Sequence, residues 1–257
     1  MTRVPLPESF LRLPLCHRGY HDLSCGIVEN SLSAFSAAIN AGYGIELDIQ
    51  LSADGQAVVF HDDTLDRVAE ATGPVIERTA AELRTIRLKH SEDRIPTFAE
   101  TLALVAGRAP LLVELKDQSG TMSSTDGRLE AATVAALQGY HGPVALMSFN
   151  PHTVARLADI APHLCRGIVT CSWGEEDAAL VGNATCDRLR PIPDYDRTQS
   201  TFISHELADL DRPRVAELKA GGAAILTWTV RSPAEEQFAR QIVHNITFEG
   251  YPASLPA

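Results

Sequence analysis

The segment IELDIQLSADGQAVVFHDD, residues 45–63, decides the fold because it joins a strand to a reversal of the chain. Its apolar residues alternate with Glu46, Asp48 and Gln50, so these three polar side chains share one face of the strand. The dipeptide Asp54-Gly55 is typical of a tight hairpin turn, and a second apolar run leads from it back to His61. If the hairpin is symmetric about this dipeptide, residue 61 faces residue 48, which brings a histidine beside two carboxylates.

The composition is that of an ordinary folded protein with an acidic net charge. A chain of 257 residues with 45% hydrophobic and 21% charged residues suits one large α/β domain as well as two small ones. The net charge of −11 argues against a general affinity for nucleic acids or anionic membranes. An anionic substrate therefore requires a local cationic site.

The cysteines and the first residues of the chain indicate a cytoplasmic protein. The five cysteines are odd in number and none forms a CxxC pair, so we expect reduced, mostly buried thiols rather than a catalytic thiol. The first fifteen residues contain three prolines and no apolar run of the length of a secretory signal. No stretch approaches the length of a membrane span, so no stable membrane association is expected.

Apolar runs alternate with amphipathic segments along the whole chain. Strands are expected at residues 13–16, 45–49, 110–115, 144–149, 167–171, 201–204, 224–230 and 245–248. Helices are expected at residues 32–41, 98–106, 126–137, 151–160 and 212–220, and one more opens at Ser232-Pro233. Eight strand-then-helix units predict an α/β fold, a (β/α)8 TIM barrel, with residues 57–60 as the return arm of a hairpin above it. The alternative is a doubly wound open sheet. The absence of a glycine-rich dinucleotide fingerprint after any strand argues against it.

One segment breaks the alternation. Residues 64–96 carry only a short helix start at Thr79, and we interpret them as an insertion on a barrel loop, after the hairpin. The sequence therefore predicts a single domain over residues 1–257.

Polar side chains cluster where the predicted strands end. In a barrel of this type all strands point their carboxyl ends at one mouth, where the chemistry is located. Each polar residue alone has a simpler explanation, such as a surface pair, an exposed salt bridge or rim packing. Those explanations would have to account separately for at least six polar residues at the same end of the barrel, so the clustering favours a functional site. These residues are His17, Arg18, Glu46, Asp48, Glu114, Lys116 and Trp228.

The carboxylates in this group predict a metal site. Glu46, Asp48 and Glu114 are hard oxygen donors, and no cysteine or histidine pair lies at ligand spacing. Such a set suits Mg²⁺ or Ca²⁺ rather than structural zinc.

The remaining residues suit phosphate chemistry. Imidazole titrates near neutral pH, so His17 and His61 are candidates for general acid and general base. Arg18 and Lys116 supply positive charge for phosphate oxygens. A metal, two imidazoles and two cations together favour hydrolysis of a phosphate ester.

At this point the sequence resembles the glycerophosphodiester phosphodiesterase family, in its bacterial, short-insertion type. The matching segments occur in the family's order and cover most of the chain. They are HRG (17–19), ENSLSAF (29–35), ELDIQLSADGQAVVFHDDTLDR (46–67), IPTFAETL (95–102), LLVELK (111–116), SFNP (148–151) and WTV (228–230).

The resemblance implies a TIM barrel with a small insertion, and an enzyme that releases sn-glycerol 3-phosphate and an alcohol from a glycerophosphodiester. It implies these roles: acid and base for His17 and His61, Ca²⁺ or Mg²⁺ ligands for Glu46, Asp48 and Glu114, phosphate contacts for Arg18 and Lys116, and walls on the glycerol side for Phe149 and Trp228. Some family members pass through a cyclic phosphate.

The chain departs from the family pattern in three places. Val28 replaces a usual proline, and the loop at residues 19–29 is longer than usual. The last strand runs on into Glu249, Gly250 and Tyr251 where Thr-Asp-x-Pro is common. We expect these changes to touch the rim, and so the choice of alcohol, and not the metal or imidazole positions.

Two other functions are open from the residues alone. A lysophospholipase D or sphingomyelinase D-like hydrolase on the same fold would need a wide apolar approach, and no cationic amphipathic helix for membrane docking is present. A non-catalytic binding barrel would require the loss of a key site residue. Among the other histidines, His90, His141 and His163 are expected to be solvated, and His205 to have a supporting or structural role.

Overall fold

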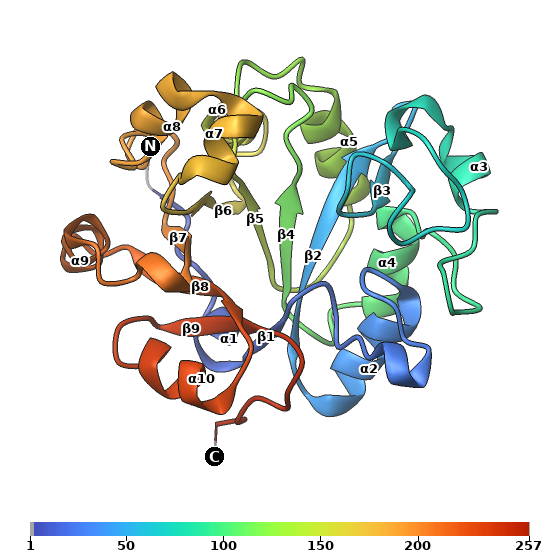
Figure 1. Ribbon diagram of the computed structural model, residues 1–257, viewed down its shortest axis with the longest axis horizontal. Helices are drawn as coiled ribbons and strands as arrows, with labels where there is room; N and C mark the ends of the chain where they lie inside the picture. Colours follow the sequence, from blue (N-terminus) through green and yellow to red (C-terminus); the bar gives the residue numbers. More distant parts are fainter. Residues whose placement is uncertain (1–2, 257) are drawn as a thin grey trace.

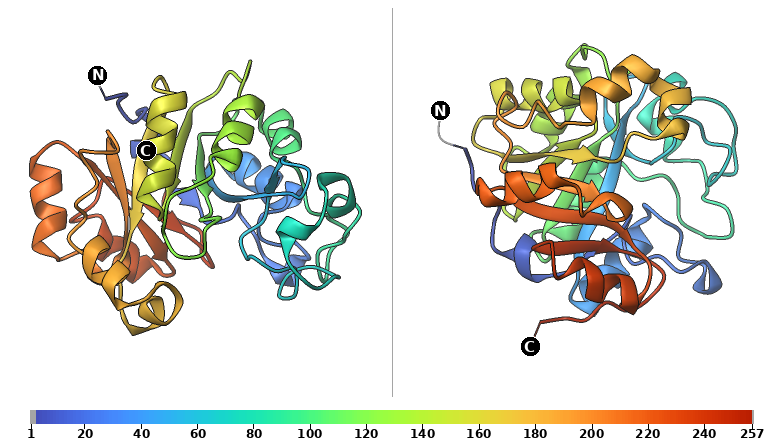
Figure 2. Two further views of the ribbon diagram at one scale, coloured as in Figure 1. Left: turned by 90° about the horizontal axis from the view of Figure 1, so that it is seen from above. Right: turned by 60° about the vertical axis from the view of Figure 1, so that its left-hand side comes forward.

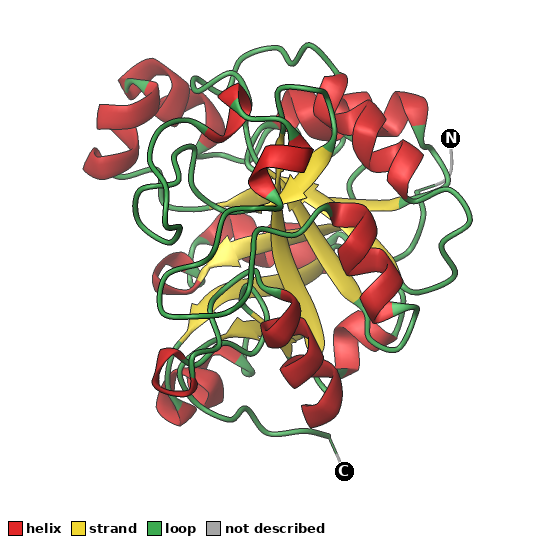
Figure 3. Ribbon diagram, turned by 90° about the vertical axis from the view of Figure 1, so that its right-hand side faces the viewer, coloured by secondary structure: helices red, strands yellow, loops and turns green. Residues whose placement is uncertain are grey.

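The computed structural model describes residues 3–256, which fold as a (β/α)8 barrel. Parallel strands form the wall, and strand β1 pairs with both β2 and β9, which closes the sheet into a barrel. The helices surround this barrel (Figures 1 and 3). The parallel strands are β1 (Leu15–Cys16), β2 (Gly44–Leu51), β4 (Leu111–Leu115), β5 (Val144–Ser148), β6 (Cys165–Thr170), β7 (Phe202–Glu206), β8 (Ala224–Val230) and β9 (Asn245–Phe248). Each of the eight expected strands is therefore confirmed.

Most helices begin where the sequence places a cap. Ser31 accepts a hydrogen bond from the backbone N–H of Ala34 at the start of α2, and Thr97 forms a capping box with Glu100 at the start of α4. The expected helices are α2 (Leu32–Ala41), α4 (Phe98–Val105), α5 (Arg128–Ala136), α6 (Pro151–Ile160), α9 (Pro213–Ala220) and α10 (Pro233–Ala239).

Three helices were not expected from the sequence. Helix α1 (Ser9–Arg12) is one turn long, too short for a periodic pattern. Helices α7 (Glu175–Val181) and α8 (Asn183–Leu189) lie between β6 and β7, and α7 buries none of its residues. Because α7 is short and only Ala178 and Val181 pack partly buried against a neighbouring apolar cluster, its sequence lacks the strong amphipathic signal that identified the other helices.

The hairpin forms as expected, but its register is shifted by one residue. Strand β3 (Ala57–Val59) runs antiparallel to β2 and pairs Val59 with Ile49. The N–H of Phe60 donates to the carbonyl of Asp48 at 3.1 Å, so residue 60, not residue 61, faces residue 48. The cause is a loop of three residues, 53–55, rather than a symmetric turn, with Gly55 at φ +78°. His61 lies one position beyond the pairing.

The segment between β3 and α4 packs around its own apolar cluster. Leu65, Val75, Leu83 and Ile95 gather there against the hairpin arm at Phe60. The segment contains the short helix α3 (Ala80–Leu83), whose capping box at Thr79 matches the expected helix start. It projects to one side of the barrel (Figure 2).

Apolar side chains fill the interior of the barrel on the side away from the mouth. Leu15, Leu112, Phe202 and Leu226 are fully buried there. At Gly167 an added Cβ would lie only 2.4–2.6 Å from three ring atoms of Phe202, so a glycine gives this aromatic ring its space. Within residues 3–256 no helix has the length and apolar character needed to cross a membrane.

Candidate active site

A cavity of about 130 Å³ lies at the mouth of the barrel, at the carboxyl ends of the strands. All nine site residues expected from the sequence line it, together with Met147, Val169, Ser204, Thr229, Arg231 and Thr247. Two of these additional residues, Arg231 and Thr229, also border a neighbouring groove.

Three carboxylates meet on one side of this cavity. Glu46 and Asp48 project from β2, and Glu114 projects from β4 in register with Asp48. They offer oxygen atoms that all lie within 4.8 Å of one another, and all three side chains are buried. Burial, followed by the charges of Asp48 and Glu114, raises the pKa of Glu46 well above its ordinary value. Buried oxygen donors that repel one another in this way fit a divalent cation.

Two cations lie against this carboxylate group. The Lys116 Nζ donates to Glu114 at 2.8 Å and lies 3.7 Å from Asp48. The Arg18 Nε lies 3.5 Å from Asp48. Burial alone would raise the pKa of Asp48, but the surrounding positive charges, led by His61 and Lys116, lower it. The mouth of the barrel therefore combines anionic and cationic groups in a small volume.

Both histidines have a carboxylate on the same ring atom. The Nδ1 of His17 lies 2.6 Å from Glu249, and the Nδ1 of His61 lies 2.7 Å from Asp62. A carboxylate on Nδ1 accepts its proton and leaves Nε2 free for proton transfer. Burial is the main cause that lowers the pKa of His17, partly offset by Glu249.

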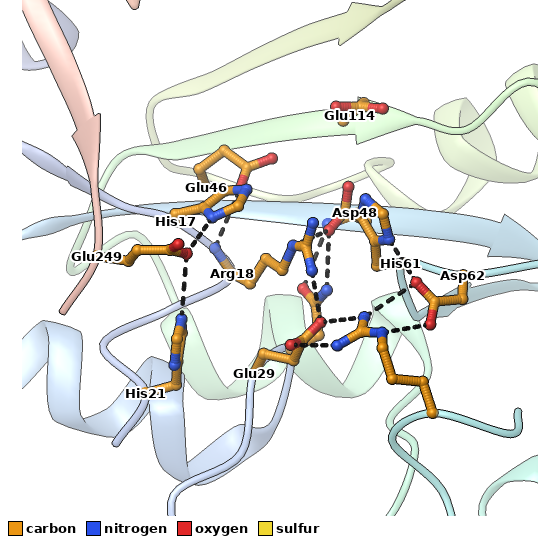
Figure 4. A network of polar contacts seen from close by, with 12 residues as sticks. His17, Arg18, His21, Glu29, Glu46, Asp48, His61, Asp62, Glu114 and Glu249 are labelled. Atoms are coloured by element: carbon orange, nitrogen blue, oxygen red, sulfur yellow. Dashed lines mark hydrogen bonds and ion pairs between the residues drawn. The ribbon is translucent and has the colours of Figure 1, made fainter. Parts of the chain in front are cut away.

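A network of ion pairs connects these groups (Figure 4). Glu29, just before α2, accepts from Arg18 at 2.7 Å and from both terminal nitrogens of Arg67 at 2.8 Å. Arg67 also donates to Asp62 at 2.6 Å. The amide of Asn30 donates to Asp48 at 2.9 Å. One arginine of the inserted segment therefore supports both Arg18 and His61.

Glu249 contradicts our expectation that the changed end of the last strand reaches only the rim. It contacts His17, one of the two imidazoles, directly. Its position could have been read from the sequence, because Thr247 and Glu249 are two residues apart and so share one strand face. In a closed barrel the last strand lies beside the first, and His17 directly follows the first strand.

Aromatic side chains form the opposite wall. The rings of Phe149 and Trp228 meet edge to face with centroids 5.5 Å apart, and Trp173 packs against Phe149 at 5.9 Å. The indole N–H of Trp228 donates to the carbonyl of Ser204 at 3.1 Å, which fixes the ring. Trp173 was not expected from the sequence.

Four further histidines, His90, His141, His163 and His205, do not line the cavity. His90, His141 and His163 are exposed, as expected. His205 is buried between Thr170 and Asp209, and does not line the cavity. The cysteines are all free thiols, and all but Cys25 are buried.

Comparisons with known proteins agree with this barrel fold. The family model described as glycerophosphoryl diester phosphodiesterase family matches residues 17–246, and the chain belongs to this family. A protein of Caldanaerobacter subterraneus named glycerophosphodiester phosphodiesterase is 33% identical over 166 residues, covering 61% of this chain and 66% of the relative. A protein of the same name from Bacillus altitudinis is 30% identical, covering 60% of this chain and 64% of the relative. The chain thus spans slightly less than two thirds of these relatives.

A solved structure has the same fold. An Oleispira antarctica phosphodiesterase in complex with the product sn-glycerol-3-phosphate superimposes with a TM-score of 0.77. The two chains are 24% identical, and the match covers 95% of each.

Proposed function

We propose that this protein hydrolyses glycerophosphodiesters to sn-glycerol 3-phosphate and an alcohol, with the whole chain acting as one catalytic domain. Family membership supports the class of reaction. The observation that carries the proposal is the pair of imidazoles, each with a carboxylate on Nδ1, in a cavity that also contains the carboxylate group. The names of the relatives point to the same substrates.

In this proposal Glu46, Asp48 and Glu114 hold Mg²⁺ or Ca²⁺. When bound, such an ion supplies positive charge that stabilises the charge developing on the phosphoryl oxygens. The side chains of Arg18 and Lys116 orient the phosphate, since both carry charge at the cavity.

In this proposal the two histidines carry out the proton transfers of the reaction. One imidazole takes a proton from the attacking oxygen, which belongs either to water or to a glycerol hydroxyl that closes a cyclic phosphate opened by water in a second step. The other imidazole gives a proton to the leaving alcohol oxygen, and both act through Nε2. Phe149 and Trp228 pack against the glycerol moiety, and their rings keep water from that side. Because Asp48 and Glu114 place negative charge in the cavity, the phosphate has to be bound through the cationic groups.

A substrate panel tests the proposal. We expect release of glycerol 3-phosphate from glycerophosphocholine, glycerophosphoethanolamine and glycerophosphoglycerol. His17→Ala and His61→Ala should each lower kcat by about 10²–10⁴-fold. The control His141→Ala alters an exposed histidine outside the cavity and should leave kcat unchanged. Turnover of none of these substrates in the presence of Mg²⁺ or Ca²⁺ contradicts the proposed reaction.

A further inference from the structure

Glu249 connects the last strand of the barrel with the first, beside the cavity. It follows β9 directly, and the carbonyl of the preceding residue, Phe248, accepts a hydrogen bond from the backbone N–H of His17 at 2.8 Å. The N–H of Glu249 donates to the carbonyl of Val230 at 3.0 Å. The backbone on both sides thus fixes where this carboxylate lies relative to the imidazole.

Every polar contact of the Glu249 side chain is with a nitrogen. Oε2 lies 2.6 Å from the Nδ1 of His17 and 3.6 Å from the Nε2 of His21 (Figure 4). Oε1 accepts from the Nε of Arg231 at 2.8 Å. An ionised carboxylate only accepts hydrogen bonds, and an arginine only donates them. Nδ1 of His17 must therefore be the protonated nitrogen of the ring.

We propose that Glu249 is a positioning residue that fixes His17 in the Nδ1–H tautomer, so that Nε2 is the nitrogen available to the substrate. This inference rests on the proposed function of His17. As acid or as base, Nε2 of His17 has to take up a proton at some stage of the cycle while Nδ1 keeps its own. In the other tautomer Nε2 already carries the hydrogen atom and has no lone pair for that proton. Arg231 contributes by holding the other oxygen of Glu249, which prevents the carboxylate from turning away.

The second imidazole has the same arrangement from a different source. Asp62, next in sequence to His61, holds its Nδ1 at 2.7 Å and is itself held by Arg67. Each histidine therefore has a carboxylate, and each carboxylate has an arginine. This repeated pattern of imidazole, carboxylate and guanidinium argues that the Glu249 contact sets up His17 for proton transfer rather than serving packing alone.

Glu249→Gln separates the tautomer from packing. A glutamine side chain has one acceptor oxygen, and the arginine at residue 231 needs an acceptor. When the oxygen turns to Arg231, the amide NH₂ donates to Nδ1 of His17 and forces the Nε2–H tautomer. We expect this switch in long-range ¹H–¹⁵N spectra of the His17 ring, and a fall in kcat of about 10-fold or more with little change in KM.

Two further variants sharpen the test. Adding Arg231→Ala to Glu249→Gln removes the competing donor, so the amide oxygen can turn to His17 and the Nδ1–H tautomer should return. Glu249→Asp keeps the charge and should retain more kcat than Glu249→Gln. The matched control is Asp209→Asn, which removes the carboxylate from the buried His205, outside the cavity, and should leave kcat unchanged.

The tautomer measurement needs no activity, so it stands apart from the proposed function. An Nε2–H tautomer in the unaltered protein overturns the inference, as does an unchanged kcat in a Glu249→Gln variant with a native circular dichroism spectrum. If Glu249→Gln does not fold, the tautomer of the unaltered protein and the activity of Glu249→Asp still decide. A full kcat for His17→Ala would instead reject the proposed role of His17.

Discussion

The carboxylate of Glu29 holds together two arginines from different parts of the chain. It accepts from Arg18 beside the cavity and from Arg67 in the inserted segment. Burial opposes its charge, but these contacts lower its pKa from 4.5 to about 2. A carboxyl whose pKa is lower in the folded protein stabilises the fold above its ordinary pKa, and this stabilisation is lost as the pH falls through the folded-state pKa.

We expect Glu29→Gln to lose stability at neutral pH and not at low pH. The difference between a pKa of 4.5 and about 2 corresponds to about 3 kcal/mol at pH 7, as an upper value. The deficit in unfolding free energy should begin to shrink below about pH 4.5 and approach zero near pH 2. Urea denaturation at pH 7 and at pH 3 measures this, and an equal deficit at both pH values would show that charge is not the cause.

The carboxylate group predicts a requirement for metal. Excess chelator should abolish turnover, and Mg²⁺ or Ca²⁺ should restore it. Because burial and neighbouring charges raise the pKa of Glu46, metal binding should displace a proton, so the apparent metal affinity should rise with pH. Glu114→Gln should weaken the affinity, measured by calorimetry, without altering the circular dichroism spectrum. Unchanged turnover in metal-free protein would reject the metal.

Single residues were predictable from sequence where a strand end marks them. His17, Glu46, Asp48 and Glu114 follow or belong to apolar runs, and the barrel brings such positions together. Glu249 was missed because its partner lies 232 residues away and its importance depends on the closure of the barrel. Trp173 was missed because it lies in a loop without a pattern.

At the scale of elements, Gly167 of β6 leaves room inside the barrel for the ring of Phe202 on the neighbouring strand β7. Gly167→Ala would drive its Cβ into the fully buried ring of Phe202. We expect a loss of about 1–3 kcal/mol in unfolding free energy, the usual range for overpacking. Gly174→Ala is the matched control. A Cβ added at Gly174 would lie 4.0 Å from the nearest atom of a non-adjacent residue, and the φ of Gly174 is −78°. Equal effects of the two substitutions in urea denaturation would contradict the steric explanation.

Element boundaries followed from the sequence where a cap or an apolar stripe was present. Helices α2 and α6 have the expected bounds, Leu32–Ala41 and Pro151–Ile160. The expected register of the hairpin was wrong by one residue. A sequence that contains Asp-Gly fits loops of two or three residues, and tertiary packing selects between them. The exposed α7 gave no signal of its own.

At the scale of the whole molecule, the surroundings of the cavity favour small polar substrates. The groove beyond Trp228 contains Leu210 and Phe238, but three carboxylates lie among them, at Glu206, Asp211 and Glu235. An acyl chain in this groove would cover charged groups, which is unfavourable. The net charge of −11 also opposes binding to anionic lipid surfaces.

We therefore expect a higher kcat/KM for glycerophosphodiesters than for lysophospholipids or sphingomyelin. Trp228→Ala should mainly raise KM, because it removes a binding contact and no proton-transfer group. Initial rates with soluble diesters and with micellar lysolipid measure both effects. Efficient turnover of lysolipid with little activity on glycerophosphocholine would favour the lysophospholipase D alternative, with Trp228 as an acyl contact.

The pairing of β1 with both β2 and β9 has a consequence for how the protein is made. During synthesis, β2 leaves the ribosome soon after β1, but the other edge of β1 has no partner until β9 has emerged. Contacts between such distant parts of a chain form late in folding. His17 stands directly after β1, so its surroundings are finished only by the last strand. The mouth around His17 is therefore complete only when β9 has joined the sheet, and a nascent chain that has every other strand still lacks it.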